Sequence, residues 1–152
     1  METIELYEIA RELGIDILNH RLPGTKMLSV MGPDGSCAVG INSREILSRL
    51  DEKSRLAHEL GHCMTGSFYN IYSPVDIRGR HEFRADRKAA FLLVPLDKLV
   101  SAVHEGIREV WRLAETFDVS EDSMQRALEI YQNILSTEEL AAFDAGEEAA
   151  YT

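Results

Sequence analysis

The chain has 152 residues, of which 45% are hydrophobic and 28% charged, so it is long enough for one domain with a buried core and unlike a disordered chain. Its formal net charge is −10, and no stretch concentrates Lys and Arg, which argues against direct binding to nucleic acid. The longest apolar run, residues 89–96, is too short to span a bilayer, so we expect no membrane span.

The chain contains two cysteines, Cys37 and Cys63, which are too few for a disulfide scaffold. The N-terminus is charged throughout and has no apolar run of the kind found in signal peptides. These features predict a reducing, cytoplasmic compartment. There we expect Cys37 to be a buried strand residue and Cys63 a core residue of a helix.

The first part of the chain predicts a helix and then a small sheet. Apolar residues at helical spacing predict an amphipathic helix over residues 3–14, which Gly14 ends. Two strong turn signals, Pro23-Gly24 and the run from Gly32 to Gly35, then separate three short segments. We predict a three-stranded antiparallel meander from these segments, which are 15–22, 26–31 and 37–41.

The rest of the chain is predicted to be mostly helical. Helical character begins within residues 42–50, and we expect Asp51 to cap a helix that runs to about Thr65. Residues 66–80, rich in Gly, Pro and aromatic side chains, predict an irregular loop. Four further helices are predicted, with Pro95 between the first two and Ser120 capping the last: 80–94, 96–105, 107–117 and 120–135.

These elements predict an α+β fold in a single domain over residues 1–135. Beyond Arg126 the chain has no Lys or Arg but several acidic residues. Residues 136–152 are therefore predicted to form an acidic, flexible tail.

The segment from His58 to His62 reads His-Glu-Leu-Gly-His, an H-E-x-x-H motif inside a predicted helix. Residues four apart project from one helical face, so both imidazoles can reach one metal ion. Glu59 is rotated by about 100° from His58, which directs its carboxylate toward an attacking water rather than toward the metal. We predict Glu59 as the general base, and Gly61 leaves room for another backbone to approach.

A third metal ligand is predicted on the next strong helix. A catalytic zinc usually takes three protein ligands and leaves one position open. Glu82 follows in the sequence, and Asp86 comes one helical turn later, so both carboxylates share a face. We predict that Glu82 binds the metal and that Asp86 accepts the free N–H of a ligating histidine. One Zn²⁺ ion is the expected cofactor, although the residues alone do not distinguish zinc from other divalent ions.

These motifs resemble those of the ImmA/IrrE family of metallopeptidases, and H-E-x-x-H followed by E-x-x-x-D resembles the gluzincin arrangement of thermolysin-like peptidases. Family members carry an N-terminal helix, a small sheet, an H-E-L-G-H helix and then E-x-x-A-(D/N)-x-x-A-x-x-L-L-x-P, a pattern that residues 82–95 fit. Residues 113–120 are similar to the family's downstream helical segment.

The resemblance implies a zincin-type helix pair and a zinc-dependent endopeptidase that uses Glu59 as general base and then general acid. It also implies a protein substrate, namely a helix-turn-helix repressor of the phage or mobile-element kind. The donor that stabilises the oxyanion stays open among four residues on or beside the predicted loop: Tyr69, Tyr72, Arg80 and His81. We further expect strand 37–41 to receive an extended substrate by strand addition.

Two other interpretations stay open. The chain could be a non-catalytic anti-repressor module that binds a repressor and uses zinc only as a brace for the fold. The helices around Asp118-Val119-Ser120 also resemble a helix-turn-helix, which would suggest direct DNA binding. Residues 107–131, however, carry three Arg against six acidic residues, so we expect packing or partner docking there instead.

Overall fold

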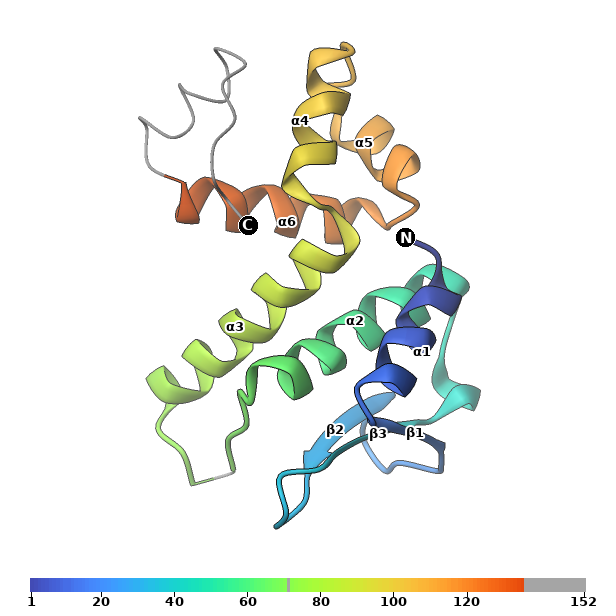
Figure 1. Cartoon of the computed structure of the whole chain (residues 1–152), viewed down its shortest axis with the longest axis vertical. Helices are drawn as coiled ribbons and strands as arrows, with labels where there is room; N and C mark the ends of the chain where they lie inside the picture. The colour runs from blue at the N-terminus through green and yellow to red at the C-terminus, as the bar shows by residue number, and fades with distance from the viewer. Residues whose placement is uncertain (71, 136–152) are drawn as a thin grey trace.

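The structure is a computed structural model that describes residues 1–70 and 72–135. Within them, α-helices and a small three-stranded sheet, which lies at one end of the molecule, confirm the predicted α+β class (Figure 1). The predicted acidic tail over 136–152 lies outside the described residues. The elements in chain order are α1 (Thr3–Glu12), β1 (Asp16–Asn19), β2 (Met27–Met31), β3 (Cys37–Ile41), a 3-10 turn (Ser43–Glu45), α2 (Arg49–Thr65), α3 (Val75–Leu93), α4 (Leu96–His104), α5 (Val110–Phe117) and α6 (Glu121–Ile134).

The sheet is mixed, and the predicted antiparallel meander is wrong. The strand order is β1-β3-β2, with β1 parallel and β2 antiparallel to the central strand β3. The connection between β1 and β2 crosses over β3 instead of forming a hairpin, and Leu22 in this connection packs against Gly40, where a Cβ would lie 3.4 Å from Leu22 Cδ1. Because β3 is paired on both sides, the free edge beside α2 belongs to β2.

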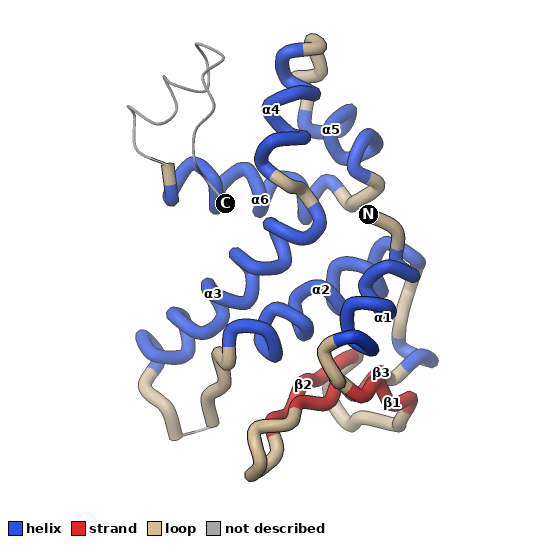
Figure 2. The backbone as a smooth tube through the Cα atoms, in the orientation of Figure 1, coloured by secondary structure: helices blue, strands red, loops and turns tan. Residues whose placement is uncertain are grey.

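One face of the sheet forms the core with α2. Met27, Val39 and Ile41 are buried in the same cluster as Leu56 and Leu60 of α2. Figure 2 shows the sheet at one end of the molecule, with α1 and α2 beside it and the C-terminal helices at the other end. The sheet therefore holds α2 by one flank and leaves its opposite flank to α3.

The ends of α2 and α3 differ from the prediction. Ser48, not Asp51, caps α2, because its side chain accepts a hydrogen bond from the backbone N–H of Asp51. The Asp51 carboxylate accepts instead from Leu47 N and Arg55 Nε. Helix α3 begins at Val75, five residues before the predicted start, because Pro74 is well suited to a helix N-terminus. The predicted irregular loop is correspondingly shorter.

The C-terminal helices are close to prediction, with Ser120 capping α6, although α5 begins only at Val110. Their turn is anchored on α2. Lys53 is 1% exposed, and its Nζ donates to the carbonyl oxygen of Asp118 at 2.8 Å, at the C-terminal end of α5. Arg49 of α2 binds both carboxylate oxygens of Asp118. The turn of the helix-turn-helix-like segment is thus bonded to α2.

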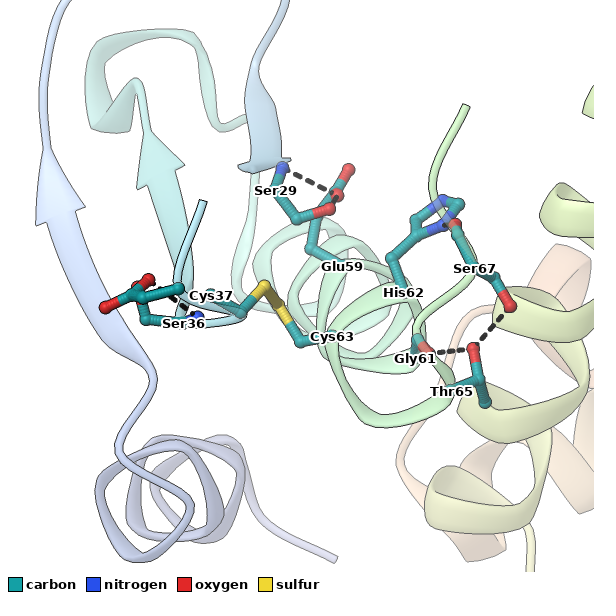
Figure 3. Close-up of a disulfide and its surroundings, with 10 residues drawn as sticks. Ser29, Ser36, Cys37, Glu59, Gly61, His62, Cys63, Thr65 and Ser67 are labelled. Carbon is teal, nitrogen blue, oxygen red and sulfur yellow. Dashed lines mark hydrogen bonds between the residues drawn. A yellow bond between two sulfur atoms is a disulfide. The ribbon is translucent and has the colours of Figure 1, made fainter. Parts of the chain in front are cut away.

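Cys37 and Cys63 form a disulfide bond, which the sequence analysis did not predict (Figure 3). Their Cα atoms are 5.8 Å apart, because packing of the sheet on α2 places the first residue of β3 beside the last turn of that helix. The expected location in strand and helix is correct, and both residues are partly buried against the core. The bond ties the sheet to the helix that carries the H-E-x-x-H motif.

Candidate metal centre

Helix α2 presents both histidines of the motif toward α3. Leu56 and Leu60 are fully buried on the sheet side, whereas the imidazoles of His58 and His62 project from the other flank. His62 is 5% exposed, and the His58 side chain is partly open to solvent. The helical spacing therefore gives the shared face that the motif predicts.

Glu82 on α3 meets this histidine pair. His58 Nε2 lies 3.2 Å from His62 Nε2 and 3.0 Å from Glu82 Oε2, and His62 Nε2 lies 3.4 Å from Glu82 Oε1. Ligand atoms bound tetrahedrally to zinc at 2.0–2.1 Å lie about 3.4 Å from one another, so these separations suit a common ion. His58, His62 and Glu82 form a group with metal-ligating potential within the described residues.

The hydrogen bonds of the two imidazoles determine which nitrogens point inward. His58 Nδ1 lies 2.8 Å from Asp86 Oδ1, and His62 Nδ1 is hydrogen-bonded to the carbonyl oxygen of Ser67. Both acceptors require N–H on Nδ1, which leaves a lone pair on each Nε2. The two lone pairs and the Glu82 carboxylate then face one point. These groups repel one another electrostatically unless a cation lies between them. The donor set therefore fits a metal ion.

The backbone turn after α2 supports His62. Gly66 ends the helix in the left-handed region with φ of 65°, and the chain turns so that Ser67, which is fully buried, presents its carbonyl oxygen to the ring. Thr65 Oγ1 donates to the Gly61 carbonyl and lies 2.6 Å from Ser67 Oγ (Figure 3). These bonds hold the turn that orients the imidazole.

Glu59 faces the free edge of the sheet. One carboxylate oxygen, Oε2, accepts hydrogen bonds from the backbone N–H of Ser29 at 2.9 Å and from the Ser29 hydroxyl (Figure 3). Lys26 and Gly32 bond through their backbone to Asn42 and Ser36, the residues that flank β3. In this antiparallel register the alternating residues Met27, Ser29 and Met31 direct their peptide groups away from β3. The carboxylate thus lies between this edge and His58.

Asp86 connects His58 to the C-terminal helices. Its Oδ1 binds His58 Nδ1, and its Oδ2 accepts from Arg126 Nε at 3.2 Å and Arg126 Nη2 at 3.0 Å. Burial raises the pKa of Asp86, but hydrogen bonds to His58 and Arg126 more than offset this, so the pKa lies below its usual value. Burial alone would lower the pKa of His58, but Asp86, Glu59 and Glu82 together raise it by more. The pKa of His58 therefore lies above its usual value.

The four oxyanion candidates are placed differently. Tyr69 donates from its hydroxyl to Glu82 Oε1 at 2.6 Å. This bond to Glu82, aided by burial, raises the pKa of Tyr69 to about 12, so the hydroxyl keeps its proton at neutral pH. His81 stacks on the Tyr69 ring, and its buried Nδ1 has no partner among the described residues. Tyr72 is 87% exposed, and Arg80 is also exposed.

Helices α2 and α3 approach closely at Gly61. A Cβ built on Gly61 would lie 2.4 Å from the carbonyl oxygen of Ala85, which is itself fully buried. The predicted role of Gly61 in allowing a second backbone to approach is therefore confirmed. Because Ala85 lies between Glu82 and Asp86, this contact sets the distance between the histidines and both carboxylates.

Two adjoining cavities lie on either side of His58 and share Ser54 and His58 as lining residues. One, of 290 Å³, extends along α2 to Met27 of β2 and includes Glu59. The other, of 230 Å³, extends between α3 and α6 and includes Asp86 and Arg126. A substrate at His58 would therefore have space on both sides.

Sequence reasoning identified the residues that converge here but missed three partners. Ser29, Ser67 and Arg126 contact Glu59, His62 and Asp86, respectively. Each lies on a different element, and no spacing rule connects it with the motif. The expectation that strand 37–41 receives substrate is wrong, because β3 is paired on both sides.

Comparison with protein families identifies a model that matches most of the chain. The family model described as Peptidase_M78, IrrE N-terminal-like domain, matches residues 10–129, a span that includes the motif, Glu82 and Arg126. Searches of curated proteins and of solved structures returned no match. Among the helices that the structure describes, none combines the length and apolar character needed to cross a membrane.

Proposed function

The chain belongs to the Peptidase_M78 family of metallopeptidases, whose model is described as the IrrE N-terminal-like domain, and we propose that it is a zinc-dependent endopeptidase. His58, His62 and Glu82 are assigned as the ligands of one Zn²⁺ ion. The observation that carries this proposal is the convergence of two Nε2 lone pairs and a carboxylate, with all three separations between 3.0 and 3.4 Å.

A zinc ion held by these ligands would lower the pKa of water to about 7 and polarise a carbonyl group. Glu59 is assigned as the base that takes the proton of the attacking water and later delivers it to the leaving amine. Ser29 holds Oε2 of this carboxylate, so we assign Oε1 to the proton. Tyr69 is assigned as the donor to the oxyanion, because it keeps its proton and already reaches Glu82.

We place an extended substrate along the free edge of β2. The peptide groups of Met27 and Met31 face away from β3, and Met27 lines the cavity that includes Glu59. Amide hydrogen exchange of the Glu59→Gln variant tests this substrate-binding position. A bound, uncleaved peptide should slow exchange at Met27 and Met31 and leave the outer strand β1 unchanged. Protection of β1 alone would refute substrate binding at the edge of β2.

For the substrate we propose a helix-turn-helix repressor of the phage or mobile-element type. This assignment extends the family resemblance to a protein partner. Direct DNA binding by the chain itself is disfavoured, because Arg126, the basic residue of α6, is paired with Asp86. Since the proposed substrate binds DNA, we place the enzyme in the cytoplasm, where the state of Cys37 and Cys63 can be determined by rapid alkylation of thiols in lysates.

The proposal is tested by incubating the zinc-loaded protein with candidate helix-turn-helix repressors from the same genome and analysing the products by mass spectrometry. The wild type should cut the repressor at a defined bond. Glu59→Gln should bind zinc and the repressor but leave it intact. If Glu59→Gln relieves repression as well as the wild type does, the chain is the non-catalytic anti-repressor module instead.

A further inference from the structure

The carboxylate of Asp86 is held from two sides by residues of different helices. Its Oδ1 lies 2.8 Å from His58 Nδ1 on α2, and its Oδ2 accepts two hydrogen bonds from the guanidinium of Arg126 on α6. Two oxygens with separate partners leave the carboxylate little freedom to rotate. The orientation of the His58 ring therefore depends on a residue forty positions beyond Asp86.

The place of Arg126 is determined by packing of the C-terminal helices. Met124 and Ala127, its neighbours on α6, are 0% and 2% exposed, and α6 packs against α3. Arg126 lines the same cavity as His58 and Asp86. A rigid helix thus delivers the guanidinium to Asp86, with Glu129 one turn further along as a weaker partner at 3.8 Å.

Stability alone does not account well for this arrangement. The side chains of Arg126 and Asp86 are 45% and 28% exposed, and ion pairs of such exposure contribute little to the free energy of unfolding. A charge-assisted bond to a planar carboxylate does, however, set its direction. The geometry therefore favours an effect on ring orientation over one on folding.

We propose that Arg126 is a positioning residue that holds Asp86, and through it His58, in the orientation that binds the metal. This inference rests on the proposed function only in requiring that His58 is a ligand. It gives the helix-turn-helix-like segment a role, because α6 then completes the metal centre from outside the zincin-type helix pair. Removal of α6 contacts should loosen metal binding even though α6 supplies no ligand.

The test is the zinc dissociation constant of the full chain, measured by competition with a chromophoric chelator, together with the thermal midpoint. Changes in residues that orient a metal ligand typically cost about 10–100-fold in affinity, and we expect that range for Asp86→Asn. Arg126→Gln acts one contact further away and should weaken zinc binding by about 3–10-fold. Arg126→Lys, which keeps the charge but only one donor group, should recover part of this loss.

Arg49→Gln is the matched control, because Arg49 also pairs through two bonds with an aspartate, Asp118, across two helices, yet contacts no residue of the metal centre. It should leave zinc affinity unchanged. In the Asp86→Asn background, Arg126→Gln should have no further effect, since the two residues act in series.

Two results would overturn the assignment of Arg126: unchanged zinc affinity in Arg126→Gln, or an equal loss in Arg49→Gln. Additive losses in the Asp86→Asn background would also overturn it. These outcomes are distinct from failure of the proposed function, which would appear as the absence of zinc binding in the wild type itself.

Discussion

Replacing Gly61 by alanine tests whether close approach of α2 and α3 builds the metal centre. The new Cβ would lie 2.4 Å from the Ala85 carbonyl oxygen, whereas ordinary contacts begin at about 3.5 Å, so the helices must separate by about 1 Å. Alanine is favoured over glycine in a helix by about 1 kcal/mol. Overpacking of this kind costs about 1–3 kcal/mol, so we expect Gly61→Ala to be destabilising overall.

Gly61→Ala should impair metal binding and catalysis more than it lowers the free energy of unfolding. The ligands of α2 and α3 are now 3.0–3.4 Å apart, and an added separation of about 1 Å takes Glu82 out of reach of an ion held by both histidines. Misplacement by about 1 Å costs on the order of 100-fold in rate. Peptide cleavage rates and zinc titration measure the effect on the site, and thermal unfolding of the same samples measures the effect on stability.

Gly79 provides the control, because it also lies within a helix, α3, and a Cβ built on it meets nothing within 4 Å. Gly79→Ala should raise the free energy of unfolding by about 0.5–1 kcal/mol and leave zinc affinity unchanged. If Gly61→Ala is stabilised as much as Gly79→Ala and binds zinc normally, the close contact does not set the ligand geometry.

Three further predictions follow from single contacts. Ser29→Ala removes the hydroxyl hydrogen bond to Glu59 but keeps the bond from the backbone N–H. The kcat should therefore fall about 10-fold with unchanged zinc content. An equal kcat in peptide cleavage assays of the wild type and Ser29→Ala would contradict this. The Cys37–Cys63 bond closes a loop with a sequence separation of 26, so its reduction should lower the free energy of unfolding by about 3.5 kcal/mol. Urea denaturation with and without reductant measures this difference. Equal urea midpoints would exclude a stabilisation by the disulfide bond. Chiefly through its bond to Arg49, the pKa of Asp118 lies below its usual value, so its stabilisation is complete above about pH 4 and is lost as the pH falls through the lowered pKa. Asp118→Asn, which still tolerates the left-handed backbone, should therefore show a flatter pH dependence of the urea midpoint below pH 4, and a parallel dependence in both proteins would refute this.

Local patterns predicted the part of the fold that local forces determine. Helical spacing placed His58 and His62 on one face, and the four-residue step from Glu82 to Asp86 did the same for the carboxylates. Glycine at position 61 correctly indicated a close backbone contact. Family resemblance added the expectation that the two helices face each other.

Features that depend on chain crossings were not predictable from these patterns. A parallel and an antiparallel partner of β3 give the same short apolar segments, so the order β1-β3-β2 left no signal in the sequence. The Cys37–Cys63 bond depends on the same packing of β3 against α2. Arg126 reaches Asp86 only because α6 packs against α3, and its sequence context resembles that of an ordinary surface arginine.

The central claim is most directly tested by titrating zinc into the metal-free wild type, Glu82→Gln and Glu59→Gln. Both glutamates lie near His58, but only Glu82 is assigned as a ligand. The wild type and Glu59→Gln should each bind one ion with similar affinity, and Glu82→Gln should bind at least about 100-fold more weakly. Undiminished binding by Glu82→Gln would contradict the assignment of the metal centre.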